Sequence, residues 1–290
     1  MSPSWVFILV VVAITFISGI FWNVTVVTFY INNWGQTLRS GGCDKIVLAT
    51  AAATALLQVM VTFGGILFYS QLFLLLPNAA LAPFLFVFQC FIDLCCWKTS
   101  WLSVCYCLKL VNFSHQILLW IKSRFPSALT SLLLGSTLGS VLINLPFLWA
   151  TIHMPLNNSS SSSAGIGMDL SFKVVKVTLG TSVPFLLSLF CILLSVRSLL
   201  RHVWRIQKNG SKYSQLAGHV RAVRTMVLRL VLDLTFCIVV MGILLFSFSI
   251  GLILGSLSWI FIMLYPSLQA LILITGSLKL MKHLFVDICL

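Results

Sequence analysis

The chain has 290 residues, of which 60% are hydrophobic and 8% are charged. Its mean hydropathy of +1.09 means more apolar surface than one soluble core of this size buries, which excludes an ordinary soluble protein and favours one embedded in a lipid bilayer. The formal net charge of +13 indicates membrane topology and contact with anionic lipid, and we expect no nucleic-acid partner.

Seven apolar stretches are long enough to cross a bilayer. A spanning helix needs about 20 mostly apolar residues, and runs of this length without alternation favour helices over lipid-facing strands. In chain order they occupy residues 5–31, 46–68, 83–109, 128–150, 174–199, 227–249 and 255–276. The predicted fold is therefore an all-α membrane protein, a single seven-transmembrane helix bundle over residues 1–290.

The first stretch lacks the basic segment and cleavage site of a removable signal peptide, so we expect it to act as its own targeting signal. The basic residues then predict the orientation. All of the 18 Lys and Arg except Lys98, Lys173 and Lys176 lie on one side of the predicted membrane. Because short basic loops stay in the cytoplasm, the N-terminus is predicted outside the cell and the C-terminus inside.

Nine cysteines are present, and the sequence indicates free thiols rather than disulfides. Cys43 and Cys289 fall on the predicted cytoplasmic side. The others lie within predicted helices, where Cys usually packs as a small apolar residue: Cys90, Cys95, Cys96, Cys105, Cys107, Cys191 and Cys237.

Two connections have a polar composition suited to recognition. Residues 151–173 are Ser-rich and predict a water-exposed extracellular loop 2, in which overlapping sequons make Asn157 or Asn158 a glycosylation site. Residues 200–226 form the predicted intracellular loop 3, with a basic composition and segments that extend helices five and six. Such basic helix ends suit docking of a partner, although the positive-inside pattern alone also accounts for the charge.

Catalytic signatures are absent from the sequence. It contains no HExxH, GxSxG, glycine-rich phosphate loop or CxxC motif, and no glutamate. Five aspartates and five histidines leave little acid–base machinery, so we expect no enzyme, no cofactor and no metal site.

Two aspartates lie deep within predicted helices, where a charge must face the bundle interior or a wet cavity. Asp233 and Arg229 are spaced as an i,i+4 pair on one helix face. Asp93 and Lys98, five residues apart, do not share a face. We therefore interpret Asp233 as structural and predict that Asp93 reaches a ligand cavity.

The third predicted helix carries the most specific pattern. Residues 97–114, WKTSWLSVCYCLKLVNFS, resemble the third-helix signature of the bitter taste receptors, the type 2 taste receptor family. The resemblance continues in SLLRH at 198–202, HVRAVRTM at 219–226 and PSLQALILITGSLKL at 266–280. It covers nearly the whole chain, and the NFS and SLxRH elements favour this family over the related vomeronasal type 1 receptors, which are the alternative.

The resemblance implies a G protein-coupled receptor of the plasma membrane. It would bind bitter small molecules from outside and activate a gustducin-type heterotrimeric G protein inside, by favouring one arrangement of its helices. The predicted ligand-binding residues are Phe88, Gln89, Ile92, Asp93, Phe236, Trp259 and Ile262. The predicted G protein-facing residues are Tyr106, Lys109, His115, Arg201, His202 and His219.

The chain also departs from the family pattern. Thr54 stands where the family has Arg, Asp233 where it has Tyr, and Gln269 followed by Ala270 where it has His-Ser. In the predicted cavity, Phe88 and Ile92 replace a Trp and an Asn, so a hydrogen-bonding anchor becomes apolar. We hypothesise that Asp93 attracts cationic amine agonists.

Two other protein classes are alternatives to a receptor. A multi-span transporter usually pairs ionisable residues at the membrane midplane, and a membrane-embedded enzyme needs a nucleophile with a base, or facing metal ligands. Neither constellation is visible in the sequence.

Overall fold

The computed structural model describes residues 3–33, 35, 43–70, 75–111, 116–153, 170–209, 216–246, 252–277 and 280–281. Within these ranges the chain is helical and forms no strand, which confirms the predicted all-α fold. The elements are α1 (Pro3–Asn32), α3 (Cys43–Tyr69), α4 (Asn78–Leu110), α5 (Gln116–His153), α6 (Leu170–Val177), the π-helical turn η2 (Thr178–Ser182), α7 (Val183–Asn209), α8 (Leu216–Phe246) and α9 (Leu252–Gly276).

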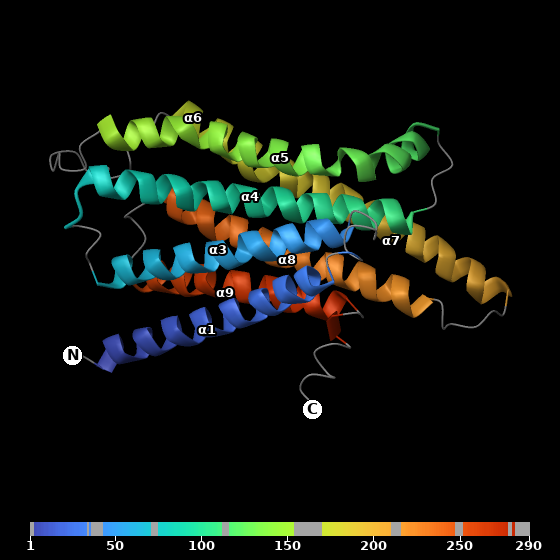
Figure 1. Ribbon diagram of the computed structural model, residues 1–290, viewed down its shortest axis with the longest axis horizontal. Coiled ribbons are helices and arrows are strands. Elements are labelled where there is room, and N and C mark those ends of the chain that lie inside the picture. The colour runs from blue at the N-terminus through green and yellow to red at the C-terminus, as the bar shows by residue number, and fades with distance from the viewer. Residues whose placement is uncertain are drawn as a thin grey trace.

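The helices lie roughly along one long axis as an antiparallel bundle (Figure 1). Because α6, η2 and α7 follow one another without a break, the described elements make seven rods. Six of these rods are long and apolar enough to span a membrane; α8 is the exception among the described residues. The charged side chains of α8 are Arg221, Arg224, Arg229 and Asp233, and residues 234–246 of this helix are mostly apolar.

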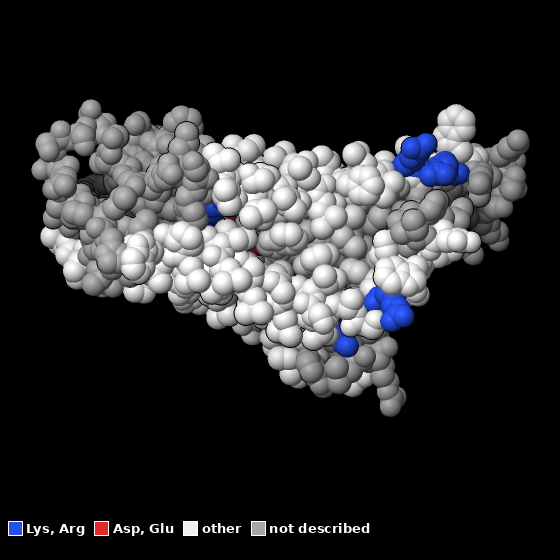
Figure 2. Space-filling view, turned by 90° about the horizontal axis from the view of Figure 1, so that it is seen from above, with Lys and Arg blue, Asp and Glu red and all other residues white. Residues whose placement is uncertain are grey.

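One end of the bundle is basic. Figure 2 shows Lys and Arg side chains gathered at the end where, in Figure 1, α7 ends and α5 and α8 begin. Lys109, Arg124, Arg201 and Arg224 are all exposed. We call this the basic end, and the positive-inside rule predicts that it faces the cytoplasm.

The outer surface between the two ends is apolar. Ile17, Leu142, Phe190 and Ile238 are 60–66% exposed although they are large hydrophobic side chains. A soluble protein rarely exposes so continuous an apolar surface, whereas lipid solvates it. The most apolar stretch of α5 is 22% buried inside the bundle and that of α3 is 56% buried. The helix α5 therefore lies at the periphery and α3 near the centre.

The interior contains two large hydrophobic clusters. One includes Leu102 of α4 and Leu273 of α9 and lies toward the basic end. The other joins α3, α4, α8 and α9 through residues such as Leu57, Phe236 and Met263. Since α4 contacts α3, α5, α7, η2 and α8, it is the helix around which the bundle packs.

A buried set of hydrogen bonds, the polar tie, joins three helices at Thr54, where the chain departs from the pattern of the family that it resembles. Thr54 Oγ1 donates to Asn23 Oδ1 at 2.5 Å. Asn23 Nδ2 donates in turn to the carbonyl oxygens of Gly19, at 2.8 Å, and Pro266, at 3.2 Å. Pro266 has no N–H and so leaves out one helical hydrogen bond of α9, and these bonds hold the helix at this proline against α1 and α3.

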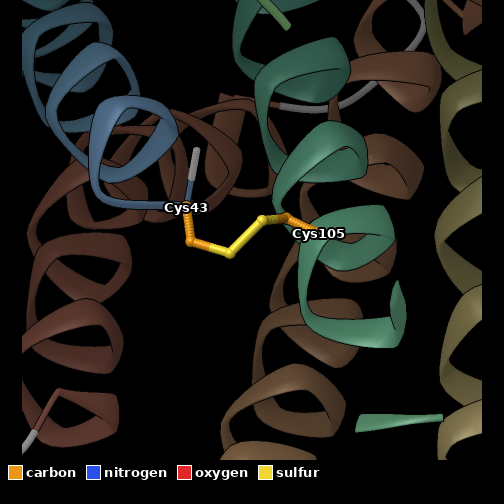
Figure 3. Close-up of a disulfide and its surroundings, with 2 residues drawn as sticks. All are labelled: Cys43 and Cys105. Carbon is orange, nitrogen blue, oxygen red and sulfur yellow. A yellow bond between two sulfur atoms is a disulfide. The ribbon is translucent and has the colours of Figure 1, made fainter. Parts of the chain in front are cut away.

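One prediction about the cysteines is wrong. Cys43 at the start of α3 and Cys105 in α4 form a disulfide, with a Cα–Cα distance of 5.9 Å (Figure 3). A position inside a helix does not prevent pairing with a cysteine on the neighbouring helix, and composition cannot show this proximity. The other described cysteines are free thiols: Cys90, Cys95, Cys96, Cys107, Cys191 and Cys237.

Candidate functional site

The rod formed by α6, η2 and α7 widens into a π-helical turn directly before Pro184. Proline has no N–H, and its ring displaces the carbonyl four residues earlier, so the regular helix is interrupted here. Ser100 Oγ of α4 donates to the Pro184 carbonyl at 2.6 Å, and Ser188 Oγ donates to Ser100 Oγ at 3.1 Å. These bonds hold α7 against α4 just beyond the π-turn. Such π-helical turns are often found at functional sites.

A cavity lies beside this turn, between α4, the α6–η2 segment and α8. Its empty volume, which includes the adjoining open solvent, is about 280 Å³, and its enclosed part has room for about one water molecule. The lining residues are Gln89, Ile92, Lys176, Val177, Thr181, Phe236, Cys237 and Val240. The mostly apolar wall with a few polar groups matches the usual composition of a small-molecule site.

The predicted ligand-binding residues fall into separate positions. Gln89, Ile92 and Phe236 line the cavity. Phe88 and Trp259 stack on each other, with ring centroids 6.2 Å apart. Ile262 is buried in the cluster shared by α3, α4, α8 and α9.

Asp93 lies behind the cavity wall. It is 1% exposed, its Oδ2 accepts a hydrogen bond from Asn144 Nδ2 of α5 at 2.7 Å, and it interacts electrostatically with Lys176. Gly180 of η2 packs directly against it, since a Cβ added to this glycine would lie 2.8 Å from Asp93 Oδ1. The charged side chain that lines the cavity is therefore Lys176 and not Asp93.

Sequence reasoning did not select Lys176. The signal was present, because an ionisable residue within a predicted span is by default a functional-site candidate. The sequence does not show that the Lys176 side chain points toward the cavity, because this depends on how α6 is rotated ahead of the π-turn.

A second buried carboxylate lies on α8, deeper in the bundle. Asp233 Oδ1 accepts hydrogen bonds from Tyr265 Oη at 2.9 Å and from Gln269 Nε2 at 2.5 Å. Arg229 interacts with it electrostatically, but the guanidinium nitrogens of this buried side chain have no hydrogen-bond partner among the described residues. Asp233 is thus held by α9 rather than by the i,i+4 partner on its own helix.

The predicted G protein-facing residues are only partly described. Tyr106 packs against the hydrophobic cluster near the basic end, whereas Lys109 and Arg201 are exposed. The side chains of His202 and His219, and the whole of His115, Asn157 and Asn158, lie outside the described residues. Over the described part of the chain, no group of three or more His, Cys, Asp or Glu side chains is placed to hold a metal ion.

Comparison with known proteins agrees with this architecture. The family model described as Taste receptor protein (TAS2R) matches residues 1–290. Taste receptor type 2 member 41 of Rattus norvegicus is 34% identical over 146 residues, which cover 47% of this chain and 47% of that protein. Taste receptor type 2 member 9 of Macaca mulatta is 30% identical over 194 residues, 63% of this chain and 61% of that protein. The chain thus spans about half the length of the first of these relatives and somewhat more of the second.

Proposed function

The chain belongs to the taste receptor protein (TAS2R) family, and from that premise we propose that it is a bitter taste receptor of the plasma membrane. It binds a bitter small molecule in the cavity between α4, α6–η2 and α8, and it activates a gustducin-type heterotrimeric G protein at the basic end. As a member of this family it is a multi-pass membrane receptor and not an enzyme.

The match of the family over the whole chain carries the proposal, and the geometry supports it. The cavity walls belong to α4 and α8, and both helices continue from the cavity to the basic end. A ligand that prefers one packing of α8 against α4 therefore acts on the same rods that present basic side chains to the cytoplasm. Rigid rods that shift between two packings are a common means of coupling distant sites.

The energetic demand on the ligand is moderate. Moving a two-state receptor from 1:99 to 99:1 requires a preference of about 5.5 kcal/mol for the active arrangement. A ligand shifts this equilibrium only by the difference between its affinities for the two arrangements. Because the cavity is small, we propose that an agonist binds more tightly when α4 and α8 lie further apart.

Calcium imaging tests the proposal. Cells that co-express the chain with a gustducin-type Gα subunit are challenged with a panel of bitter compounds. We expect concentration-dependent responses that need both the chain and the Gα subunit. A chain that reaches the cell surface, as shown by staining of an N-terminal tag on intact cells, yet responds to no compound would contradict the function.

Glycosylation gives an independent test of the orientation. We propose that Asn157 or Asn158 carries a glycan, because both lie in the loop predicted to be outside the cell. Treatment with a glycosidase should raise the electrophoretic mobility of the wild type and leave a chain with both Asn→Gln changes unaffected. The two single variants show which sequon is used.

A further inference from the structure

The polar part of the cavity wall consists of hydrogen-bond donors and one amide. Lys176 supplies an ammonium group, Thr181 a hydroxyl and Gln89 an amide. Lys176 is 3% exposed and Gln89 is 8% exposed, so these groups act in a largely dry environment. Among the described residues of the wall, Lys176 is the charged one.

A buried carboxylate lies near this ammonium and interacts with it electrostatically. Asp93 interacts electrostatically with Lys176, and Asn144 fixes the carboxylate from α5. The two opposite charges offset each other, which lowers the free-energy cost of a charged Lys176 beside an apolar cavity. An ammonium has three N–H donors and no acceptor, so the ligand atom beside it must accept a hydrogen bond.

A cationic amine does not fit this wall. It would meet the ammonium as a like charge at short range in a low-dielectric environment. To reach Asp93 it would have to displace Lys176 and leave that ammonium buried without its counter-ion, which is strongly unfavourable. The arrangement of this wall thus favours a ligand class opposite to the one that the position of Asp93 in the sequence suggested.

We propose that this cavity selects agonists that present an acceptor oxygen to Lys176 and carry a compact apolar body. The acceptor is a carbonyl, lactone or carboxylate oxygen. The apolar body packs against Ile92, Phe236 and Val240, which line the same space. The inference rests on the proposed receptor function and specifies which molecules it serves.

Matched compounds on one ring skeleton test the proposal. One carries a ketone or lactone, one a carboxylate and one a primary amine, and each is measured by its half-maximal concentration in the calcium assay. We expect acceptor compounds to activate the wild type and the amine to be inactive. A lactone response without a carboxylate response identifies a neutral acceptor, and the opposite result identifies an anion.

Substitutions at Lys176 then locate the recognition. Lys176→Met keeps the length of the side chain but removes the donors, and we expect it to raise the half-maximal concentration of acceptor compounds about 10- to 100-fold, the range for hydrogen bonds to charged groups. Lys176→Arg keeps the donors and should restore most of the response. Leu179→Met is the matched control, since Leu179 lies on the adjacent η2 turn and is 44% exposed.

Loss of folding is separated from loss of recognition by a double variant. Lys176→Met alone leaves Asp93 without its cation, whereas Lys176→Met with Asp93→Asn removes both charges and should reach the cell surface. The double variant should respond to acceptor compounds as weakly as Lys176→Met. A double variant that reaches the surface and responds like the wild type overturns the proposal.

The thiol of Cys237 offers a test that needs no agonist. Cys237 lines the cavity with Lys176, and its thiolate forms a disulfide with a methanethiosulfonate reagent, releasing methanesulfinate. Labelling that disappears in Cys237→Ala should be faster with the anionic reagent than with the cationic one, and Lys176→Met should reduce this ratio. Faster cationic labelling overturns the proposal.

Different results would contradict the receptor function and the preference for acceptor ligands. Amines that activate the wild type and lose their effect in Asp93→Asn overturn the acceptor inference but leave a working receptor. A surface-expressed wild type that responds to none of the compounds overturns the receptor function, and the inference with it.

Discussion

The molecule buries two aspartates, each beside a cation, and the surroundings of the two differ. The outer cluster, Asp93, Asn144 and Lys176, borders a cavity and a π-helical turn. The inner cluster, Arg229, Asp233, Tyr265 and Gln269, lies within packed helices, and Phe236 stacks on Tyr265 with ring centroids 3.8 Å apart. Similar charges therefore border the proposed recognition site in one place and join packed helices in the other.

The inner cluster also explains two departures from the family pattern together. Asp233 and Gln269 each replace the residue typical of the family, and in the structure they hydrogen-bond to each other. A carboxylate buried on α8 needs donors on a neighbouring helix, and Gln269 with Tyr265 supplies them from α9. The two changes compensate each other, because the carboxylate gained on α8 accepts a hydrogen bond from the amide gained on α9.

The largest expected effect comes from breaking the inner cluster. Asp233→Ala leaves the Arg229 charge and the polar groups of Tyr265 and Gln269 buried without the carboxylate, so we expect a loss of stability of about 3–5 kcal/mol. Thermal unfolding of the detergent-solubilised receptor measures it. Combining Asp233→Leu with Arg229→Met removes both charges and should recover most of the loss; an unchanged melting temperature in Asp233→Ala would show that the cluster is no brace.

A smaller effect is expected at the turn that closes the outer cluster. In Gly180→Ala the added methyl meets Asp93, and overpacking of this kind costs about 1–3 kcal/mol. We expect a lower melting temperature together with weaker agonist responses. Gly139→Ala is the control, because nothing lies within 4 Å of its added Cβ. Equal behaviour of the two variants would mean that η2 can move away from α4.

A neutral polar tie should matter less than either ionic cluster. Thr54→Val removes the hydroxyl that donates to Asn23 while nearly keeping the shape, and a net hydrogen bond contributes about 1 kcal/mol. Thermal unfolding should show a correspondingly small decrease. A loss as large as that of Asp233→Ala would mean that the hydrogen bonds around Thr54 and Asn23 stabilise the bundle as much as the inner cluster does.

The smallest effect in cells is expected at the disulfide. Cys43 and Cys105 lie at the basic end, and cytosolic glutathione keeps most thiols reduced. Cys43→Ala should therefore change the free energy of unfolding of the receptor in cells by less than about 1 kcal/mol, the scale of removing one buried atom. In the purified oxidised protein, a reductant should lower the melting temperature of the wild type but not of Cys43→Ala. A reductant that acts equally on both would contradict the bond.

The candidate site was predictable in part. Gln89, Ile92 and Phe236 were expected in the cavity from their helical positions and the family resemblance, and they line it. Lys176 was not selected, and Asp93 was expected to face a ligand rather than to stand behind the wall. Both differences depend on which faces of α6 and α4 meet, and the apolar pattern of neither helix specifies this.

Composition and motifs were enough to identify a helical membrane bundle and the family of this chain. The free energy of placing a stretch in lipid is a sum over its own residues, and family motifs are strings of neighbouring residues, so both are local properties. Three features became visible only in the packed bundle: the bond between Cys43 and Cys105, the partners of Asp233 and the position of Lys176 in the cavity wall. Each of these depends on contacts between residues far apart in the chain, and the apolar pattern of one helix does not specify which face meets which neighbour.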